Sequence, residues 1–338
     1  MAEPAYIDML QGTEAEVAET EDQLALPCLS RGSSLCESAL AQAWPFPTHA
    51  DSRDSEELAV PDSDTAYNSA LRDLRFSSYA FQVAASAALN TARVQKEVKS
   101  LAKDLPCDSS ASIYVSMNQD YMGYFQAILS GTTDSPYAYG LYLFDISLPE
   151  DYPYNPPKMT ILTTGNGNVR FNPNLYADGY LCLSILNTWG STPEEMWSAA
   201  GHSTLLQVLI SIQSLIMDHN VIQKEPGYED YGSESEGNLL YRDIVRYNNM
   251  KWAMEDVIRN PSPAFAEVIR THFRLLREDI LAMGLKWLEE TLDDNPEDPD
   301  GLVAAHNCST CEEFRLKGRK TCMREAYEAL AVALASLP

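Results

Sequence analysis

Helical periodicity and then alternation divide the first half of the chain into two kinds of structure. Between residues 67 and 103, Val94, Val98 and Leu101 recur at helical spacing, which places them on one face of a helix. Other positions of this stretch carry basic residues, namely Arg93, Lys96, Lys99 and Lys103. The pattern predicts an amphipathic helix that buries its apolar side chains and turns a basic side toward solvent.

Short apolar runs follow the helix. Ile113, Val115 and Met117 occupy alternate positions, as is typical of a strand. Further runs lie at residues 124–129, 141–146 and 159–162. The turn-rich residues 131–140 and the pair Pro156-Pro157 interrupt them, and proline does not fit inside a central strand. Consecutive strands with short connections predict a four-stranded antiparallel meander.

Helical patterns return after the strands. Thr204 can cap a helix over residues 205–216, and apolar stripes predict two further helices over residues 239–260 and 265–290. Asn260-Pro261-Ser262-Pro263 separates the latter two. A last short helix is expected over residues 324–337. A helix, a meander and a set of later helices together predict an α+β fold.

The N-terminal part of the chain has a different composition. Between Glu3 and Asp64, fourteen acidic residues stand against Arg31 and Arg53, a net charge of −12 out of −25 for the whole chain. Such a segment buries too little apolar surface to offset its ordering entropy. We therefore expect a disordered acidic tail over residues 1–66, a core domain over 67–230, a helical extension over 231–290, and an acidic linker with a terminal helix over 291–338.

The overall charge limits the partners that the chain is expected to bind. A net charge of −25 disfavours phosphate contacts, so neither nucleic acid nor an anionic membrane is an expected partner. No apolar run is long enough for a membrane span, and the start of the chain lacks the basic segment of a secretory signal. The seven cysteines are scattered and odd in number, which suits a reducing compartment. These properties predict a cytoplasmic or nuclear protein.

The candidate chemistry lies in residues 169–186. Cys182 follows Asn174 in this stretch, and Asn172-Pro173 and Asp178-Gly179 are turn signals beside them. A thiol on a stiff loop near a side-chain amide suits acyl transfer. A half-buried structural cysteine is the ordinary alternative.

Three motifs occur in fixed order around this thiol. Tyr152-Pro153-Tyr154-Asn155-Pro156-Pro157 comes first, Phe171-Asn172-Pro173-Asn174 follows, and Cys182-Leu183-Ser184-Ile185-Leu186 ends the series. Together they resemble the ubiquitin-conjugating (E2) family, and with Thr163-Thr164-Gly165 they resemble its large-E2 subgroup of the BRUCE/Apollon type. The resemblance extends over about residues 79–290 and implies the ubiquitin-conjugating (UBC) fold.

The resemblance implies a role for three side chains. Cys182 would accept ubiquitin, or a ubiquitin-like protein, from an E1 enzyme as a thioester and pass it to a lysine of a substrate protein. Asn174 would stabilise the oxyanion, and Glu225 would orient the lysine, with Asp218 and Glu229 as weaker alternatives. A turn cap for Asn174 and an exposed loop carboxylate for Glu225 remain as structural alternatives.

No metal or other cofactor is expected for this chemistry. ATP binding is expected of the pathway, with ATP itself spent on the E1. Asn172 replaces a histidine of the family that is mainly structural, so activity is expected to survive. A zinc site would need four ligands at compatible spacing. Cys308 and Cys311 fit one half of such a site, but the second pair is missing or mixed, since only His306 and Cys322 are available for it.

Partner contacts are implied at three places. The helix with Arg93, Lys96 and Lys99 would meet the E1 and often an E3 ligase, although charged faces are usually only solvated. Tyr154 would form the tip of an E3-binding loop, or else pack over the sheet edge. Trp197 begins Trp-Ser-Ala-Ala where E2s often have Trp-Ser-Pro-Ala, and the missing proline argues against standard E3 docking.

Two other functions fit parts of the sequence. A non-enzymatic binding module of the same fold would typically lack the cysteine. A cysteine hydrolase would need His202 or His219 within hydrogen-bond reach of Cys182. An E2 needs no such imidazole, so the surroundings of the thiol distinguish the two enzymes.

Overall fold

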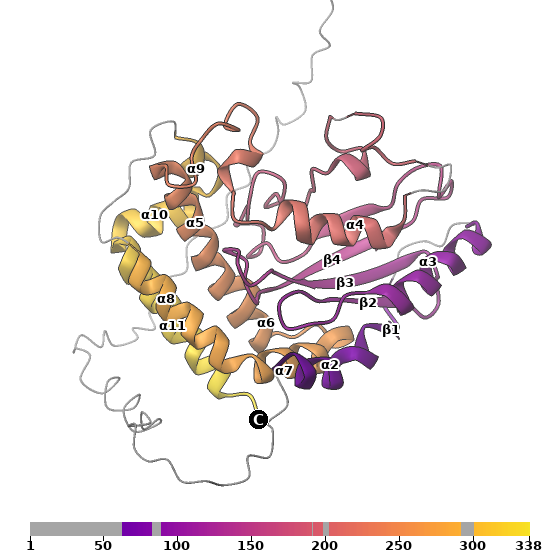
Figure 1. Cartoon of the computed structure of the whole chain (residues 1–338), viewed down its shortest axis with the longest axis horizontal. Helices are drawn as coiled ribbons and strands as arrows, with labels where there is room; N and C mark the ends of the chain where they lie inside the picture. Colours follow the sequence, from indigo (N-terminus) through magenta and orange to yellow (C-terminus); the bar gives the residue numbers. More distant parts are fainter. Residues whose placement is uncertain (1–62, 83–88, 191, 199–202, 292–300) are drawn as a thin grey trace, which may run out of the picture. The chain divides into compact units, whose positions relative to one another are not determined.

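The computed structural model describes residues 63–338 except 83–88, 191, 199–202 and 292–300, and except the side chains of Ser63 and Cys308. These residues belong to one compact unit, Ala59–Pro338 (Figure 1). The tail expected over residues 1–66 lies almost wholly outside the described residues. Its last positions are helical, because helix α2 (Ser63–Leu71) begins there and buries Tyr67 completely.

The described chain forms one five-stranded sheet in the order β1-β2-β3-β4-β5. Strands β2 (Ile113–Asn118), β3 (Tyr124–Ser130), β4 (Leu141–Ser147) and β5 (Lys158–Ile161) pair antiparallel in sequence, which confirms the predicted meander. Strand β1 (Phe76–Tyr79) pairs parallel with β2 and was not predicted. The helix expected within residues 67–103 is therefore interrupted, and only α3 (Thr91–Asp104) carries the basic pattern.

Helices α3 and α4 (Leu205–Ser211) pack against each other beside the sheet. Asn90 caps α3, and Thr204 caps α4 as predicted, in a capping box with Gln207. The apolar stripe of α3 is buried at Val94 and Leu101, also as predicted. The chain leaves α4 through a π-helical stretch, η3 (Ile212–Ile216).

The helix predicted over residues 239–260 has a π-helical centre. It consists of α5 (Glu236–Asn248), η5 (Asn249–Glu255) and α6 (Asp256–Arg259). At the junction, the buried amide Nδ2 of Asn249 donates to the carbonyls of Pro136 and Ala138, and its Oδ1 accepts from Tyr142. These bonds tie the extension to the loop before β4.

The C-terminal part is more extensively folded than the sequence predicts. Helices α7 (Ala266–Leu275) and α8 (Arg277–Glu290) correspond to the predicted helix over residues 265–290. The acidic linker expected near residues 293–301 lies almost wholly outside the described residues. The expectation of one short helix after it is wrong, because α9 (Leu302–His306), α10 (Cys308–Lys317) and α11 (Arg319–Ala335) follow residue 301. Helix α11 contacts α8 and η5, and buries Cys322, Leu330 and Leu334 completely.

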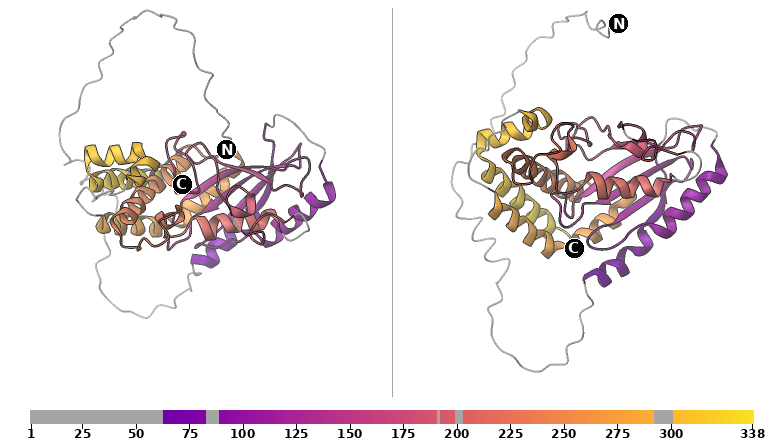
Figure 2. Two further views of the ribbon diagram at one scale, coloured as in Figure 1. Left: turned by 90° about the horizontal axis from the view of Figure 1, so that it is seen from above. Right: turned by 45° about the horizontal axis from the view of Figure 1, so that its top comes forward.

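The C-terminal helices gather at one end of the sheet. In Figure 1, α8, α10 and α11, drawn in orange to yellow, lie opposite α3, and Figure 2 shows the same arrangement from two further directions. The remaining short elements are η1 (Arg72–Leu74), η2 (Ser184–Leu186), η4 (Ile222–Lys224) and η6 (Pro263–Phe265). Within the described part of the chain, no helix combines the length and the apolar character that a membrane span requires.

Candidate functional site

Cys182 lies at the end of a tightly bonded loop. Isolated bridges pair Leu175 with both Asn172 and Leu181, and the backbone N–H of Cys182 donates to the carbonyl of Asn174 over 2.9 Å. The flanking Leu181 and Leu183 are buried, which anchors the thiol between them. Cys182 itself is 5% exposed, so only a small part of this residue reaches the surface.

Asn174 lies beside the cysteine, as the sequence predicts. Its Nδ2 donates to the backbone carbonyl of Cys182 over 2.9 Å, and its Oδ1 has no hydrogen-bond partner among the described residues. In the free protein, the side-chain amide of Asn174 therefore stabilises the loop by bonding to the backbone of Cys182.

Asn172 performs the structural task that the resemblance assigns to a histidine at this position. Its Oδ1 accepts from the backbone N–H groups of Asn174 and Leu175, at 2.8 and 2.9 Å. Its Nδ2 donates to the Tyr137 hydroxyl and the Ile216 carbonyl. One buried amide thus closes the turn and ties it to the helix that follows α4.

The thiol is surrounded by a phenol, a guanidinium and a carboxylate. Burial raises the pKa of Cys182, while a hydrogen bond with Tyr176 and the positive charge of Arg170 lower it, and the charge of Glu225 raises it. The guanidinium carbon of Arg170 lies 3.9 Å from the centre of the Tyr176 ring. These residues lie in or near the cysteine loop, yet the sequence pattern did not single out Arg170 or Tyr176.

A cysteine hydrolase finds no support in these surroundings. Among the described residues, the groups that act on the pKa of Cys182 do not include an imidazole. His219 is exposed, and His202 lies outside the described residues. The paired thiol and imidazole that define such a hydrolase are therefore not seen in the described part of the chain.

Glu225 is the candidate carboxylate that the structure brings to the site. It follows η4, and its Oε2 lies 3.8 Å from Nη2 of Arg170 and 3.8 Å from Nε2 of His306. The weaker candidates are engaged locally, because Asp218 pairs with Lys224 over 2.8 Å and Glu229 accepts from the N–H of Gly227. Nothing in the sequence pattern connected His306 with this loop.

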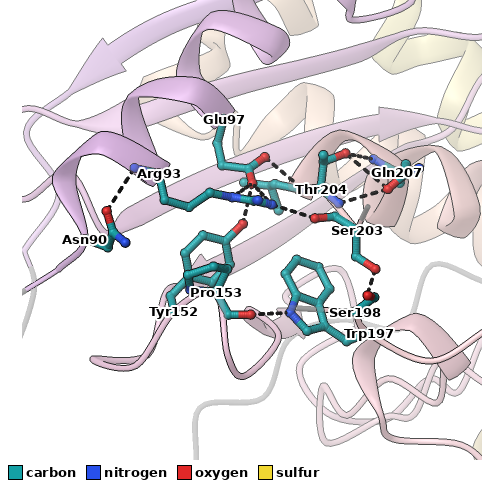
Figure 3. A network of polar contacts seen from close by, with 11 residues as sticks. Asn90, Arg93, Glu97, Tyr152, Pro153, Trp197, Ser198, Ser203, Thr204 and Gln207 are labelled. Carbon is teal, nitrogen blue, oxygen red and sulfur yellow. Dashed lines mark hydrogen bonds and ion pairs between the residues drawn. The ribbon is translucent and has the colours of Figure 1, made fainter. Parts of the chain in front are cut away.

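Three predicted contact residues remain at the surface and two do not. Tyr154 is 78% exposed, and Lys96 and Lys99 are exposed on α3. By contrast, Trp197 is 8% exposed and donates from Nε1 to the Pro153 carbonyl over 2.7 Å. Arg93 donates to the Ser203 carbonyl over 2.6 Å and pairs with Glu97 (Figure 3). Arg93 and Trp197 thus make contacts inside the domain, and the expected partner contacts at these two residues stay a prediction.

The buried carboxylate of Glu97 is the centre of the network in Figure 3. Its Oε1 accepts from Arg93 and from the Tyr152 hydroxyl, and its Oε2 accepts from the backbone N–H of Leu205 at the start of α4. The ring of Trp197 packs against the ring of Tyr152, with 5.7 Å between the ring centres. The network fixes the loop of Tyr154 relative to α3 and α4.

The C-terminal cysteines and histidine have other partners in the structure. The Cys322 thiol donates to the Glu313 carbonyl, and the His306 ring contacts Tyr241. Over the described residues, no group of three or more His, Cys, Asp or Glu side chains is arranged to hold a metal ion. That statement does not include the side chain of Cys308, which lies outside the described part of the chain.

A groove of about 480 Å³ begins next to the cysteine. Its walls come from the segment after Cys182, from the loop before α4, and from α4 and η3; they include Leu183, Ile185, Met196, Gln207 and Leu215. Leu215 is exposed although it is apolar. The groove offers a mixed surface on which a protein attached to the thiol could rest.

Comparisons with known proteins agree with this geometry. The family described as "Ubiquitin-conjugating enzyme" matches residues 93–246. The human "Dual E2 ubiquitin-conjugating enzyme/E3 ubiquitin-protein ligase BIRC6" is 38% identical over 71% of this chain and 5% of its own length. "Probable ubiquitin-conjugating enzyme protein 17" of Caenorhabditis elegans is 42% identical over 62% of this chain and 29% of its own length.

A viral protein is also similar to this chain. "Probable ubiquitin-conjugating enzyme E2 R521" of Acanthamoeba polyphaga mimivirus is 43% identical over 60% of this chain and 14% of its own length. The chain thus spans less than a third of each of these curated relatives. The matched segment contains the meander, the cysteine loop and α4, so this chain belongs to the ubiquitin-conjugating enzyme family, and its conjugating domain is similar to that of BIRC6.

Proposed function

We propose that the chain is an E2 enzyme that carries ubiquitin, or a ubiquitin-like protein, on Cys182 and transfers it to a lysine of a substrate protein. The observation that carries this proposal is the pairing of Cys182 with the side chain of Asn174, 2.9 Å from the cysteine carbonyl, inside the segment that matches the family. ATP acts at the E1, and ATP binding by this chain is not supported and not proposed.

The first step is a thioester exchange. The Cys182 sulfur, as thiolate, attacks the C-terminal carbonyl carbon of the modifier on the E1; a new S–C bond forms, and the E1 sulfur leaves as a thiolate. A thiolate is a sufficient nucleophile without a paired base. The raised pKa of Cys182 keeps most of the free enzyme in the thiol form at neutral pH, which limits unwanted reactions of the sulfur.

The second step forms the isopeptide bond. A lysine amine attacks the thioester carbonyl, the N–C bond forms, the Cys182 thiolate leaves, and the amine gives up one proton to solvent or to a nearby carboxylate. Negative charge develops on the carbonyl oxygen during this attack. The amide of Asn174 would release the Cys182 carbonyl and donate to that oxygen, a contribution of about 10²–10³ in rate for one such donor.

A charging assay tests the carrier step. Incubation of the full chain with E1, ATP and ubiquitin should give an adduct that is cleaved by reducing agent. Cys182→Ala should abolish the adduct, and Cys311→Ala, which removes a cysteine of α10, should leave it unchanged. The absence of an adduct with ubiquitin and with every ubiquitin-like modifier tested, or an adduct that survives Cys182→Ala, would refute the proposal.

A discharge assay tests the role of Asn174. The Asn174→Ala variant should charge and then lose ubiquitin to free lysine about 10²-fold more slowly than the wild type. Asn174→Asp is the matched control for shape, because it keeps the side-chain size and loses the donor. Equal discharge of all three proteins would remove the oxyanion role and leave Asn174 as a turn residue.

The partners follow from the same reaction. We propose an E1 contact on α3 through the exposed Lys96 and Lys99, and an E3 contact at Tyr154. Lys96→Glu with Lys99→Glu should slow E1-dependent charging without changing discharge.

A free thiol at Cys182 favours a reducing compartment, so we also propose a cytoplasmic or nuclear location. Imaging of the tagged full chain tests this location.

A further inference from the structure

His306 connects the C-terminal helices with the cysteine site. It is the last residue of α9, which lies beyond the residues that match the family. Its Nε2 lies 3.8 Å from Oε2 of Glu225, and Nη2 of Arg170 lies 3.8 Å from the same oxygen. One oxygen of Glu225 is thus flanked by an imidazole and a guanidinium from distant parts of the chain.

The orientation of the imidazole is fixed on its other side by Tyr241. The Tyr241 hydroxyl lies 3.2 Å from Nδ1 of His306, and the two rings meet edge to face. Tyr241 is completely buried in α5, and burial raises its pKa, so its hydroxyl stays protonated. A hydroxyl that donates to Nδ1 leaves the ring proton on Nε2, which faces Glu225.

Packing that does not involve Glu225 holds α9 in place. Val303 and Asn307 are buried, and α9 contacts both α5 and α10. The Ser309 hydroxyl of α10 makes a second bond to the core, donating to the Asn168 carbonyl over 3.2 Å. The C-terminal helices therefore hold His306 in place through contacts that do not involve Glu225.

We propose that His306 is a positioning residue of the transfer reaction: with Arg170 it holds Oε2 of Glu225 and leaves Oε1 for the lysine amine that attacks the Cys182 thioester. Among the described residues, Oε1 of Glu225 has no hydrogen bond or ion pair, and the side chain is 25% exposed. A carboxylate already held by one oxygen loses less freedom when the amine binds. The inference rests on the function proposed above and adds a residue from outside the conjugating domain.

Single-turnover discharge to free lysine tests this role. The full chain is charged with ubiquitin, the E1 is stopped, and loss of the thioester is followed at several lysine concentrations. His306→Ala should charge at the wild-type rate and discharge about 3–10-fold more slowly at low lysine, with a higher half-saturating lysine concentration. His306→Gln should recover part of the loss, because its neutral amide N–H replaces the imidazole nitrogen that faces Glu225.

Two further variants separate positioning from a general loosening of the fold. In a Glu225→Gln background, His306→Ala should cause no additional loss, because the carboxylate that it positions is gone. Ser309→Ala removes a different bond between the C-terminal helices and the core, the one to the Asn168 carbonyl, and should discharge like the wild type.

The outcomes that overturn the inference are distinct from a failure of the proposed function. Equal discharge of His306→Ala and wild type, an unchanged additional loss in the Glu225→Gln background, or an equal slowing by Ser309→Ala would each refute the positioning role. Failure of the wild-type chain to charge at all would instead refute the E2 function, and the His306 variants would then have no reaction to affect.

Discussion

Removal of the buried carboxylate of Glu97 should destabilise the junction of α3, α4 and the Tyr152–Pro153 segment. Glu97 is 2% exposed and accepts from the Arg93 guanidinium, the Tyr152 hydroxyl and the Leu205 N–H, at 2.8, 2.6 and 3.0 Å. Glu97→Ala leaves all three donors without this acceptor. Arg93 is largely buried, so its charge would lack a partner that water can only partly replace.

The magnitude follows from the kind of interaction that is lost. Removing one partner of a buried ion pair costs about 3–5 kcal/mol, chiefly because the other charge remains buried. Each neutral donor left unsatisfied adds about 1 kcal/mol or more when water cannot reach it. Because Arg93 keeps its bond to the Ser203 carbonyl, we expect the lower half of the ion-pair range, and with the two neutral donors a total loss of about 5–6 kcal/mol.

Denaturant unfolding measures this loss directly. Glu97→Ala should lower the midpoint with little change in slope, and Glu97→Gln should lose less because it retains an acceptor oxygen. Lys99→Ala, an exposed change on the same helix, should stay within about 0.5 kcal/mol of the wild type. A loss below about 1 kcal/mol for Glu97→Ala would show that the network does not hold these elements together.

Three further predictions concern other parts of the molecule. His272 is completely buried, and burial lowers its pKa to about 4. Between pH 6.5 and about 4 the unfolded chain therefore binds a proton that the folded chain does not, and the free energy of unfolding should fall across that window by about 3 kcal/mol relative to His272→Gln. Unfolding at several pH values measures this fall. The pKa of Cys182 is raised, so its alkylation rate should rise only above the usual thiol range of about 8.5, and Glu225→Gln should shift that rise to lower pH because one negative charge is removed. Asn249→Ala removes three buried hydrogen bonds, two to the loop before β4 and one to Tyr142 of β4, and should cost about 2–4 kcal/mol in the same unfolding assay. No change would show that the π-helical junction does not depend on Asn249.

Local sequence determined the parts of this protein whose signals are short in range. The alternation of Ile113, Val115 and Met117 was sufficient to predict a strand, because a period of two is typical of one, although in the structure both faces of β2 are largely buried. The capping role of Thr204 was also visible, because its partner Gln207 is only three residues away in the sequence. The turns around Asn174 and Cys182 also lie within a few residues of each other, so the candidate site was apparent before any tertiary contact was known.

Features that depend on distant partners could not be predicted in this way. Strand β1 is short, and only its pairing with β2 makes it a strand. The basic pattern of α3 does not distinguish Lys99, which is exposed, from Arg93, which is buried against Glu97 and the Ser203 carbonyl. The difference depends on which side of the helix α4 covers, and no local pattern records that.

The C-terminal region shows the same division most clearly. Its charge and prolines near residues 293–301 indicated a linker, and the sequence beyond it had only one recognisable short helix. In the structure, the buried face of α11 is completed by α8 and η5, and α9 places His306 beside Glu225. The sequence alone determined the candidate thiol and its amide neighbour, because they share one loop. The surroundings of Glu225 were decided only when separate helices packed together.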